Sequence, residues 1–268
     1  MQINYNGTGT RQWSNKSINF QTGCEHNCLV CYAKEMSIRY GHSTKNNWNN
    51  ARIRTNDVKK KISKWNESMM MFPSSHDITP NNIRYAMIVL RKILEADNEV
   101  LIVSKPHYKC IKQICDEFSD YKDKILFRFT IGSYSNKVLK FWEPGAPSLN
   151  ERMKSLKCAF NSGFETSVSI EPMMDNKVGK VIDAVKPYVT ETIWLGKVNQ
   201  MWSRLKRNTN MNNNIVKKAN QLDQWQSDPN ILKLYNKYKN DPVIMWKDGI
   251  QKVVTRSKKV NKKVKKVT

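Results

Sequence analysis

The chain has 268 residues, of which 39% are hydrophobic and 10% aromatic. This composition excludes a disordered chain and allows a sizeable core. No apolar run reaches about 18 residues, and the polar N-terminus lacks the apolar segment of a secretory signal. We therefore expect no membrane association and a cytoplasmic location, in the host cytoplasm if the gene is a phage gene. In a reducing cytoplasm, clustered cysteines more often bind metal than form disulfides.

The net charge of +23 is unevenly distributed along the chain. Residues 252–268 carry eight Lys or Arg and no acid, which leaves +15 for the first 251 residues. A basic body with a basic tail favours a polyanionic partner, with DNA or RNA as the simplest choice. A solvated tail combined with the Lys and Asn bias of an AT-rich genome is the alternative.

Strand and helix patterns alternate along the first 200 residues. The expected strands are 17–21, 68–73, 99–104, 124–133, 164–172 and 191–196. The expected helices are 31–41, 79–97 with Thr79 and Pro80 at its start, 107–118, 148–163 with Ser148 and Glu151 as a capping box, and 176–188. This alternation predicts an α/β fold with a parallel sheet or partial barrel over residues 1–200. Residues 201–251 read as a C-terminal helical extension, and residues 252–268 as a basic, disordered tail.

Polar clusters follow each expected strand at its carboxyl end. They are Cys24, "SSHD" (74–77), "SKP" (104–106), "GSYS" (132–135), "EPMMD" (171–175) and "GKVNQ" (196–200). In barrel-like α/β folds the carboxyl ends of the strands build the active site. The pattern therefore favours an enzyme over a simple binding module.

Three cysteines, Cys24, Cys28 and Cys31, form a C-x3-C-x2-C motif after the first expected strand. Three thiolates are one ligand short of a closed tetrahedral site, and a zinc site completed by His26 or His42 is one possibility. The motif, in "TGCEHNCLVCYA", with the later "EPGAPSLNERM" and "SIEPM", resembles the radical S-adenosylmethionine (SAM) enzymes. Over about residues 11–200 the chain is similar to their spore photoproduct lyase-like branch, especially uncharacterised phage and bacterial members.

This resemblance implies a (β/α)6 TIM-like partial barrel and a [4Fe–4S] cluster held by the three cysteines, with S-adenosyl-L-methionine on the fourth iron. It also implies formation of a 5′-deoxyadenosyl radical and an electron donor such as flavodoxin or ferredoxin. The expected substrate is a nucleic-acid base or nucleotide. The lyases carry a cysteine as hydrogen donor three residues before the Asp of the second-strand segment. Ser74 stands there in this chain, so repair of thymine dimers is not the first expectation.

The resemblance also assigns cofactor-binding residues. Tyr32 matches a position beside the cofactor, whereas Val30 replaces a common aromatic residue. Ser75 and His76 match contacts to the methionine amine. Alternatively, His76 could be a hydrogen-bond donor to a neighbouring residue, without contacting the cofactor. Lys105 and Ser133 match positions near the methionine carboxylate and the ribose. The resemblance also places Glu143, Arg152 and Glu171 at the cofactor, but each has a structural alternative. Glu143 and Arg152 could instead form an ion pair at a helix start. Glu171 could instead cap the next helix with its carboxylate.

Two other functions remain open at this point. One is a radical SAM enzyme acting on a peptide or small metabolite, with the basic tail incidental. The other is a non-catalytic iron–sulfur protein that binds nucleic acid. Cys110, Cys115 and Cys158 are expected to be buried free thiols.

Overall fold

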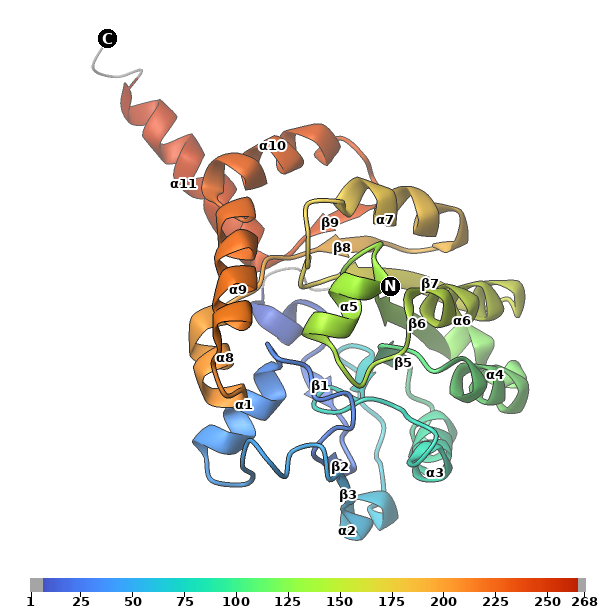
Figure 1. Ribbon diagram of the computed structural model, residues 1–268. Helices are drawn as coiled ribbons and strands as arrows, with labels where there is room; N and C mark the ends of the chain where they lie inside the picture. The colour runs from blue at the N-terminus through green and yellow to red at the C-terminus, as the bar shows by residue number, and fades with distance from the viewer. Residues whose placement is uncertain (1–6, 265–268) are drawn as a thin grey trace.

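The computed structural model describes residues 7–264, in which seven strands form one parallel sheet (Figure 1). The order β1-β4-β5-β6-β7-β8-β9 follows the chain, and β2 and β3 form a separate antiparallel pair. The strands are β1 (Lys16–Ser17), β2 (Gln21–Thr22), β3 (Arg52–Ile53), β4 (Met70–Phe72), β5 (Val100–Ser104), β6 (Ile125–Thr130), β7 (Glu165–Ile170), β8 (Ile193–Leu195) and β9 (Ile244–Trp246). The predicted α/β class is confirmed.

Helices connect successive parallel strands and cover the outer face of the sheet (Figure 1). They are α1 (Tyr32–Arg39), α2 (Thr55–Lys59), α3 (Ile83–Glu95), α4 (Tyr108–Glu117), α5 (Asn136–Trp142), α6 (Leu149–Asn161), α7 (Val178–Val185), α8 (Met201–Asn208), α9 (Asn213–Trp225), α10 (Asp228–Tyr238) and α11 (Asp248–Val264). Short 3-10 helices lie at Gly9–Gln12, Ser119–Lys124 and Lys186–Tyr188. No helix within the described residues is both long enough and apolar enough to cross a membrane.

Side-chain alternation along the strands separates two apolar layers. Met70, Phe72 and Phe127 belong to the main core. Met69 and Met71 belong to a smaller cluster with Trp13, Leu101, Leu126 and Trp194. Because successive strand residues point to opposite faces, these two clusters are the two faces of one sheet. Both faces are apolar, as expected for a parallel sheet covered on each side.

Helix starts are only partly as predicted. Ser148 caps α6, since its hydroxyl accepts a hydrogen bond from the Glu151 N–H at 3.3 Å. Helix α3 begins at Ile83, four residues after Thr79. The Asn82 side chain accepts from the Thr79 N–H at 2.8 Å and closes a turn there, which delays the helix.

The C-terminal region differs most from the prediction. The expected helical extension contains β9, which pairs with β8 and adds a seventh strand to the predicted six. The expected disordered tail is helical as far as Val264, while residues 265–268 lie outside the described range. Ile250, Val253 and Val254 are buried in the main core, and their helical spacing anchors α11.

Candidate active site

A cavity of about 460 Å³ opens at the carboxyl ends of the parallel strands. Residues at or just beyond the ends of β4, β5, β6, β7 and β8 line it, including Ser74, Ser104, Thr130, Glu171 and Lys197. All three motif cysteines face the same cavity. Five of the six clusters predicted from the sequence therefore meet in one cavity, at the end of the sheet where α/β enzymes carry their chemistry, and only "GSYS" (132–135) does not line it.

The cysteine loop is held in place by close backbone packing. The Cys24 N–H donates to the Trp48 carbonyl at 3.0 Å. Gly23 has φ +86°, and an added Cβ would lie 2.5 Å from that same carbonyl oxygen. Gly145 packs against the loop from the other side, where a Cβ would meet the Glu25 oxygen at 2.2 Å. The "EPGAP" segment thus clamps the cysteine loop, which explains why both motifs occur in one chain.

Burial keeps the thiols of Cys24 and Cys28 protonated. Burial, with the neighbouring Asp77 and Cys31 charges, raises the pKa of Cys24 to about 12. Burial also raises the pKa of Cys28 well above its ordinary value, and Glu143, Cys31 and Cys24 raise it further. The three sulfurs therefore affect one another electrostatically. A bound metal cation would relieve the repulsion between the thiolates, and its binding would release protons from the thiols.

Asp77 is the centre of a buried hydrogen-bond network. Its carboxylate accepts from the Ser104 hydroxyl at 2.6 Å and from the Lys105 N–H at 2.8 Å. It also pairs with His26 Nδ1 at 3.0 Å, and the His26 Nε2 atom lies 3.0 Å from His107 Nε2. Burial alone would raise the pKa of Asp77, but His26, Lys105 and Ser104 hold it well below its ordinary value. Asp77 therefore joins the cysteine loop to the end of β5.

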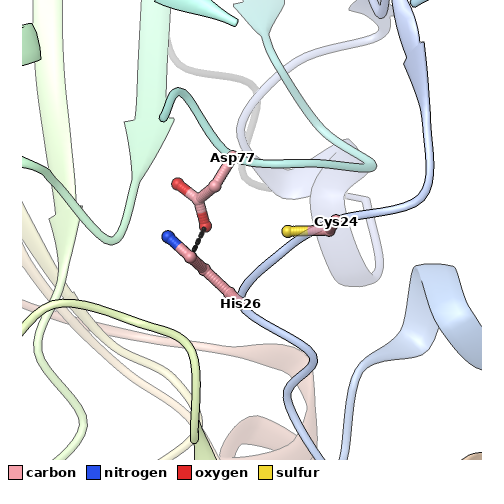
Figure 2. Close-up of side chains that lie close together, drawn as sticks. All are labelled: Cys24, His26 and Asp77. Atoms are coloured by element: carbon pink, nitrogen blue, oxygen red, sulfur yellow. Dashed lines mark hydrogen bonds and ion pairs between the residues drawn. The ribbon is translucent and has the colours of Figure 1, made fainter. Parts of the chain in front are cut away.

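Figure 2 shows Cys24, His26 and Asp77 close together, with ligand-type atoms all within 4.8 Å of one another. Among the described residues these three form the compact group that could hold a metal ion, and Cys28 and Cys31 are not part of it. His42, the other histidine considered for zinc, is exposed and does not line the cavity.

Lys105 lies in the cavity wall between two carboxylates. Its Nζ is 3.9 Å from Asp77 and 3.9 Å from Glu143. Burial opposes its charge, but Cys28, Glu143 and Asp77 together raise the pKa of Lys105 above its ordinary value. Glu143 also pairs with Arg152 at 2.6 Å, and both side chains are at most 1% exposed. Lys105 is thus a fixed cation beside the cysteine loop.

Most of the predicted cofactor residues line the cavity: Tyr32, Ser75, His76, Lys105, Glu143 and Glu171. His76 is engaged at both ring nitrogens, with the Phe20 N–H at 3.3 Å and the Asp77 carbonyl at 3.2 Å. Burial lowers the pKa of His76 to about 4. The neutral ring therefore holds the loop after β4 through these two contacts.

Ser133 and Arg152 do not line the cavity. The Ser133 hydroxyl donates to Asp175 at 2.5 Å. Arg152 donates to the Pro147 carbonyl at 2.9 Å and the Thr130 carbonyl at 3.0 Å. Its contacts are those of the structural ion pair considered as its alternative role. Glu171 pairs with Lys247 at 3.4 Å, and burial raises the pKa of Glu171.

Several cavity residues were missed from the sequence. Three of them lie outside the predicted rim clusters: Met36, Trp48 and Arg204. Three others lie inside those clusters but were given no role of their own: Asp77, Lys197 and Asn199. Asp77 stands inside the quoted "SSHD" segment, so its position after a buried strand was a usable signal. Arg204 comes from α8, in the region read only as an extension, and burial lowers its pKa. No local pattern links α8 to the cavity, because the contact depends on how α8 packs against α1.

The fold and the site together define an α/β protein with the fold of spore photoproduct lyase. Two solved structures of that enzyme match this chain at 14% identity, covering 86% of this chain and 75% of the lyase chain. A variant with bound AdoMet and dinucleoside spore photoproduct gives a TM-score of 0.54. The enzyme complexed with dinucleoside spore photoproduct gives 0.52.

Two curated proteins match at the sequence level, and both are uncharacterised. A protein of Acidianus two-tailed virus is 26% identical over 184 residues, which cover 64% of this chain and 60% of the viral protein. A protein of Methanocaldococcus jannaschii is 24% identical over 174 residues, covering 64% of this chain and 66% of that protein. The chain thus spans less than two thirds of either relative. No family model matches the chain.

Proposed function

We propose that the chain is a radical SAM enzyme whose substrate is a nucleic-acid base or nucleotide. The observation that carries this proposal is the convergence of Cys24, Cys28 and Cys31 on one cavity at the carboxyl ends of the strands. In this proposal the three cysteines hold a [4Fe–4S] cluster and leave one iron for S-adenosylmethionine. When bound, the cluster would supply the electron that cleaves S-adenosylmethionine to give a 5′-deoxyadenosyl radical.

The donor set suits a cluster better than a single zinc ion. Thiolates bind zinc at about 2.3 Å, which puts tetrahedral sulfurs about 3.8 Å apart. Cys28 and Cys31 lie outside the compact group formed by Cys24, His26 and Asp77. A cluster of several irons holds its cysteines farther apart, in agreement with this arrangement. His26, the fourth ligand required by the zinc hypothesis, is already held by Asp77 and His107.

The cavity wall supplies groups suited to S-adenosylmethionine. Lys105 would bind the methionine carboxylate as a fixed cation. Asp77 and Glu143 flank Lys105 at 3.9 Å each and hold its ammonium group in the cavity wall. Val30, Met36 and Met174 give an apolar wall for the adenine or a substrate base.

The nucleic-acid substrate is supported by the net charge of +23 and by the lyase-like fold. Ser74 lines the cavity where the lyases that the chain resembles carry a cysteine, and its hydroxyl accepts from the Asn19 side chain at 2.9 Å. A serine O–H bond is too strong to replace a thiol as hydrogen donor. We therefore propose a base modification or repair other than cleavage of thymine dimers.

Production of 5′-deoxyadenosine tests the reaction class. The protein is reconstituted anaerobically with iron and sulfide, reduced, and supplied with S-adenosylmethionine. We expect 5′-deoxyadenosine, and we expect deuterium transfer into it from a labelled oligonucleotide or nucleotide but not from labelled peptides. A reduced protein that binds iron but gives no 5′-deoxyadenosine would support the non-catalytic iron–sulfur alternative.

Cysteine substitutions test the cluster ligands. Cys24→Ala, Cys28→Ala and Cys31→Ala should each abolish the broad absorption of the reconstituted protein at about 400 nm. Cys110→Ala, Cys115→Ala and Cys158→Ala are matched controls that should keep it. Retention of iron by Cys24→Ala together with its loss in Cys158→Ala would refute the assignment.

The electron paramagnetic resonance (EPR) signal of the reduced protein tests the open iron. Addition of S-adenosylmethionine should change this signal, and Lys105→Ala should require more S-adenosylmethionine for the same change. An unchanged signal at saturating S-adenosylmethionine would indicate a cluster with four protein ligands.

A further inference from the structure

We propose that helix α11 is a binding surface for the phosphodiester backbone of a nucleic acid. The proposal depends on the charge and position of this helix, and it holds whatever reaction the cavity carries out. From Lys252 to Val264 the helix carries six cations and no acid: Lys252, Arg256, Lys258, Lys259, Lys262 and Lys263. At 1.5 Å per residue this segment extends about 18 Å, enough to follow several phosphates.

The four cations from Lys252 to Lys259 are exposed and weakly neutralised. Lys252 and Arg256 pair with Asp248 and Asp228, but their side chains remain 68% and 67% exposed. Lys258 and Lys259 are also exposed, and the ion pairs found among the described residues include neither of them. Lys252, Arg256 and Lys259 follow a spacing of four and three residues, which aligns them on one helix face.

This arrangement is unfavourable without a partner. Like charges three or four positions apart on a helix repel one another. The first turns of α11 are held by Ile250, Val253 and Val254 in the core. Figure 1 shows the rest of the helix projecting beyond the body of the protein. A helix that projects while repelling itself gains stability when a polyanion neutralises its charge, which identifies the chemistry of the partner.

A nucleic acid fits this surface better than an anionic membrane. A helix that lies on a membrane needs a free apolar face as well as cations. In the part of α11 whose side chains the structure describes, the apolar residues Ile250, Val253 and Val254 are already buried in the core. Phosphodiester binding requires only exposed cations and the release of counterions.

The start of α11 borders the cavity. The Gly9 N–H donates to Asp248 at 3.4 Å, and Gly9 lines the cavity. Lys247, just before the helix, pairs with Glu171 of the cavity wall. Asn199, another cavity residue, lies against Gly249. A backbone bound along α11 is therefore led towards the cavity mouth.

Paired substitutions test the surface better than a deletion, because removing residues 252–268 would also take Val253 and Val254 out of the core. The test variant is Lys258→Gln with Lys259→Gln. The matched control is Lys60→Gln with Lys61→Gln, which removes equal charge from exposed positions just after α2. Figure 1 shows α2 and α11 at opposite ends of the molecule.

Binding is measured by fluorescence anisotropy with single-stranded DNA and RNA of one sequence at several salt concentrations. We expect the α11 variant to bind about tenfold more weakly and to lower the salt slope by about 1.4, at about 0.7 per lost phosphate contact. The control should stay within about twofold of the unmodified chain. The DNA and RNA arms show which backbone is preferred.

Equal losses in the α11 variant and the control would overturn the proposal, since they would reflect net charge alone. Binding to anionic vesicles without binding to either nucleic acid would overturn it too. Formation of 5′-deoxyadenosine without substrate should be unchanged in the α11 variant. Its absence in every variant would contradict the proposed function and leave this inference standing.

Discussion

The cavity and helix α11 both concentrate charge, but they hold it in opposite ways. In the cavity wall each carboxylate has a fixed partner: Asp77 pairs with His26, Glu143 with Arg152, and Glu171 with Lys247. On α11 the charges repel one another and face water. In our proposals the cavity would therefore depend on single residues in a low-dielectric site, whereas α11 would act through the sum of weak, salt-screened contacts.

The largest difference should come from breaking one ion pair in each region. Arg152→Met leaves Glu143 buried without its closest partner, and we expect the free energy of unfolding to fall by about 3–5 kcal/mol. Arg256→Met, which breaks the exposed pair with Asp228, should cost no more than about 1 kcal/mol. Denaturant titrations of the metal-free protein measure both changes.

Arg152→Lys replaces Arg152→Met as the test variant if Arg152→Met does not fold. Its loss in the free energy of unfolding should lie between those of Arg152→Met and Arg256→Met, because it keeps the charge but loses the guanidinium fork. Equal losses for Arg152→Met and Arg256→Met would mean that burial does not separate the two regions.

A second comparison uses pH. His76 is neutral in the folded chain, where burial lowers its pKa to about 4 from an ordinary value of 6.5. Below pH 6.5 the unfolded chain binds a proton that the folded chain refuses, so stability is lost as pH falls towards 4. We expect a loss of about 2–3 kcal/mol between pH 7 and pH 4.5 that His76→Gln lacks.

His76→Gln keeps an acceptor for the Phe20 N–H but does not titrate. Unfolding titrations of the metal-free protein at both pH values measure the difference. Lys258→Gln with Lys259→Gln leaves His76 and its surroundings unchanged, so this variant should follow the unmodified chain. A parallel decline in His76→Gln would show that other groups cause the acid sensitivity.

Local sequence patterns were enough for the αβ alternation and the rim. Buried strands such as Val100–Ser104 have continuous apolar runs, and the chemistry follows them at fixed offsets. The cysteine loop could be predicted because its three cysteines lie within eight residues. Its clamp by Gly145 could not, because a close backbone approach between distant segments has no local signal.

The prediction of the C-terminal region was wrong for a related reason. Strand β9 is only three residues long, too short to be recognised from its own sequence, and it is a strand because it pairs with β8. In α11 the density of lysine masked the apolar spacing of Ile250, Val253 and Val254. Asp77 was overlooked because its importance comes from partners on two other segments, the cysteine loop with His26 and the end of β5 with Ser104 and Lys105.

The smallest expected effect is also the sharpest contrast between the regions. Lys259→Glu replaces repulsion with attraction towards Arg256, three positions earlier in the helix, and should stabilise α11 by about 0.2–0.5 kcal/mol. Amide hydrogen exchange should therefore slow slightly in α11, while affinity for single-stranded nucleic acid falls. A buried site cannot show this opposition, because reversing a charge such as Lys105 would break its packing and its function together. Helix α11 would thus be a surface whose binding charge costs stability. Faster exchange in Lys259→Glu, or unchanged nucleic-acid affinity, would contradict that interpretation.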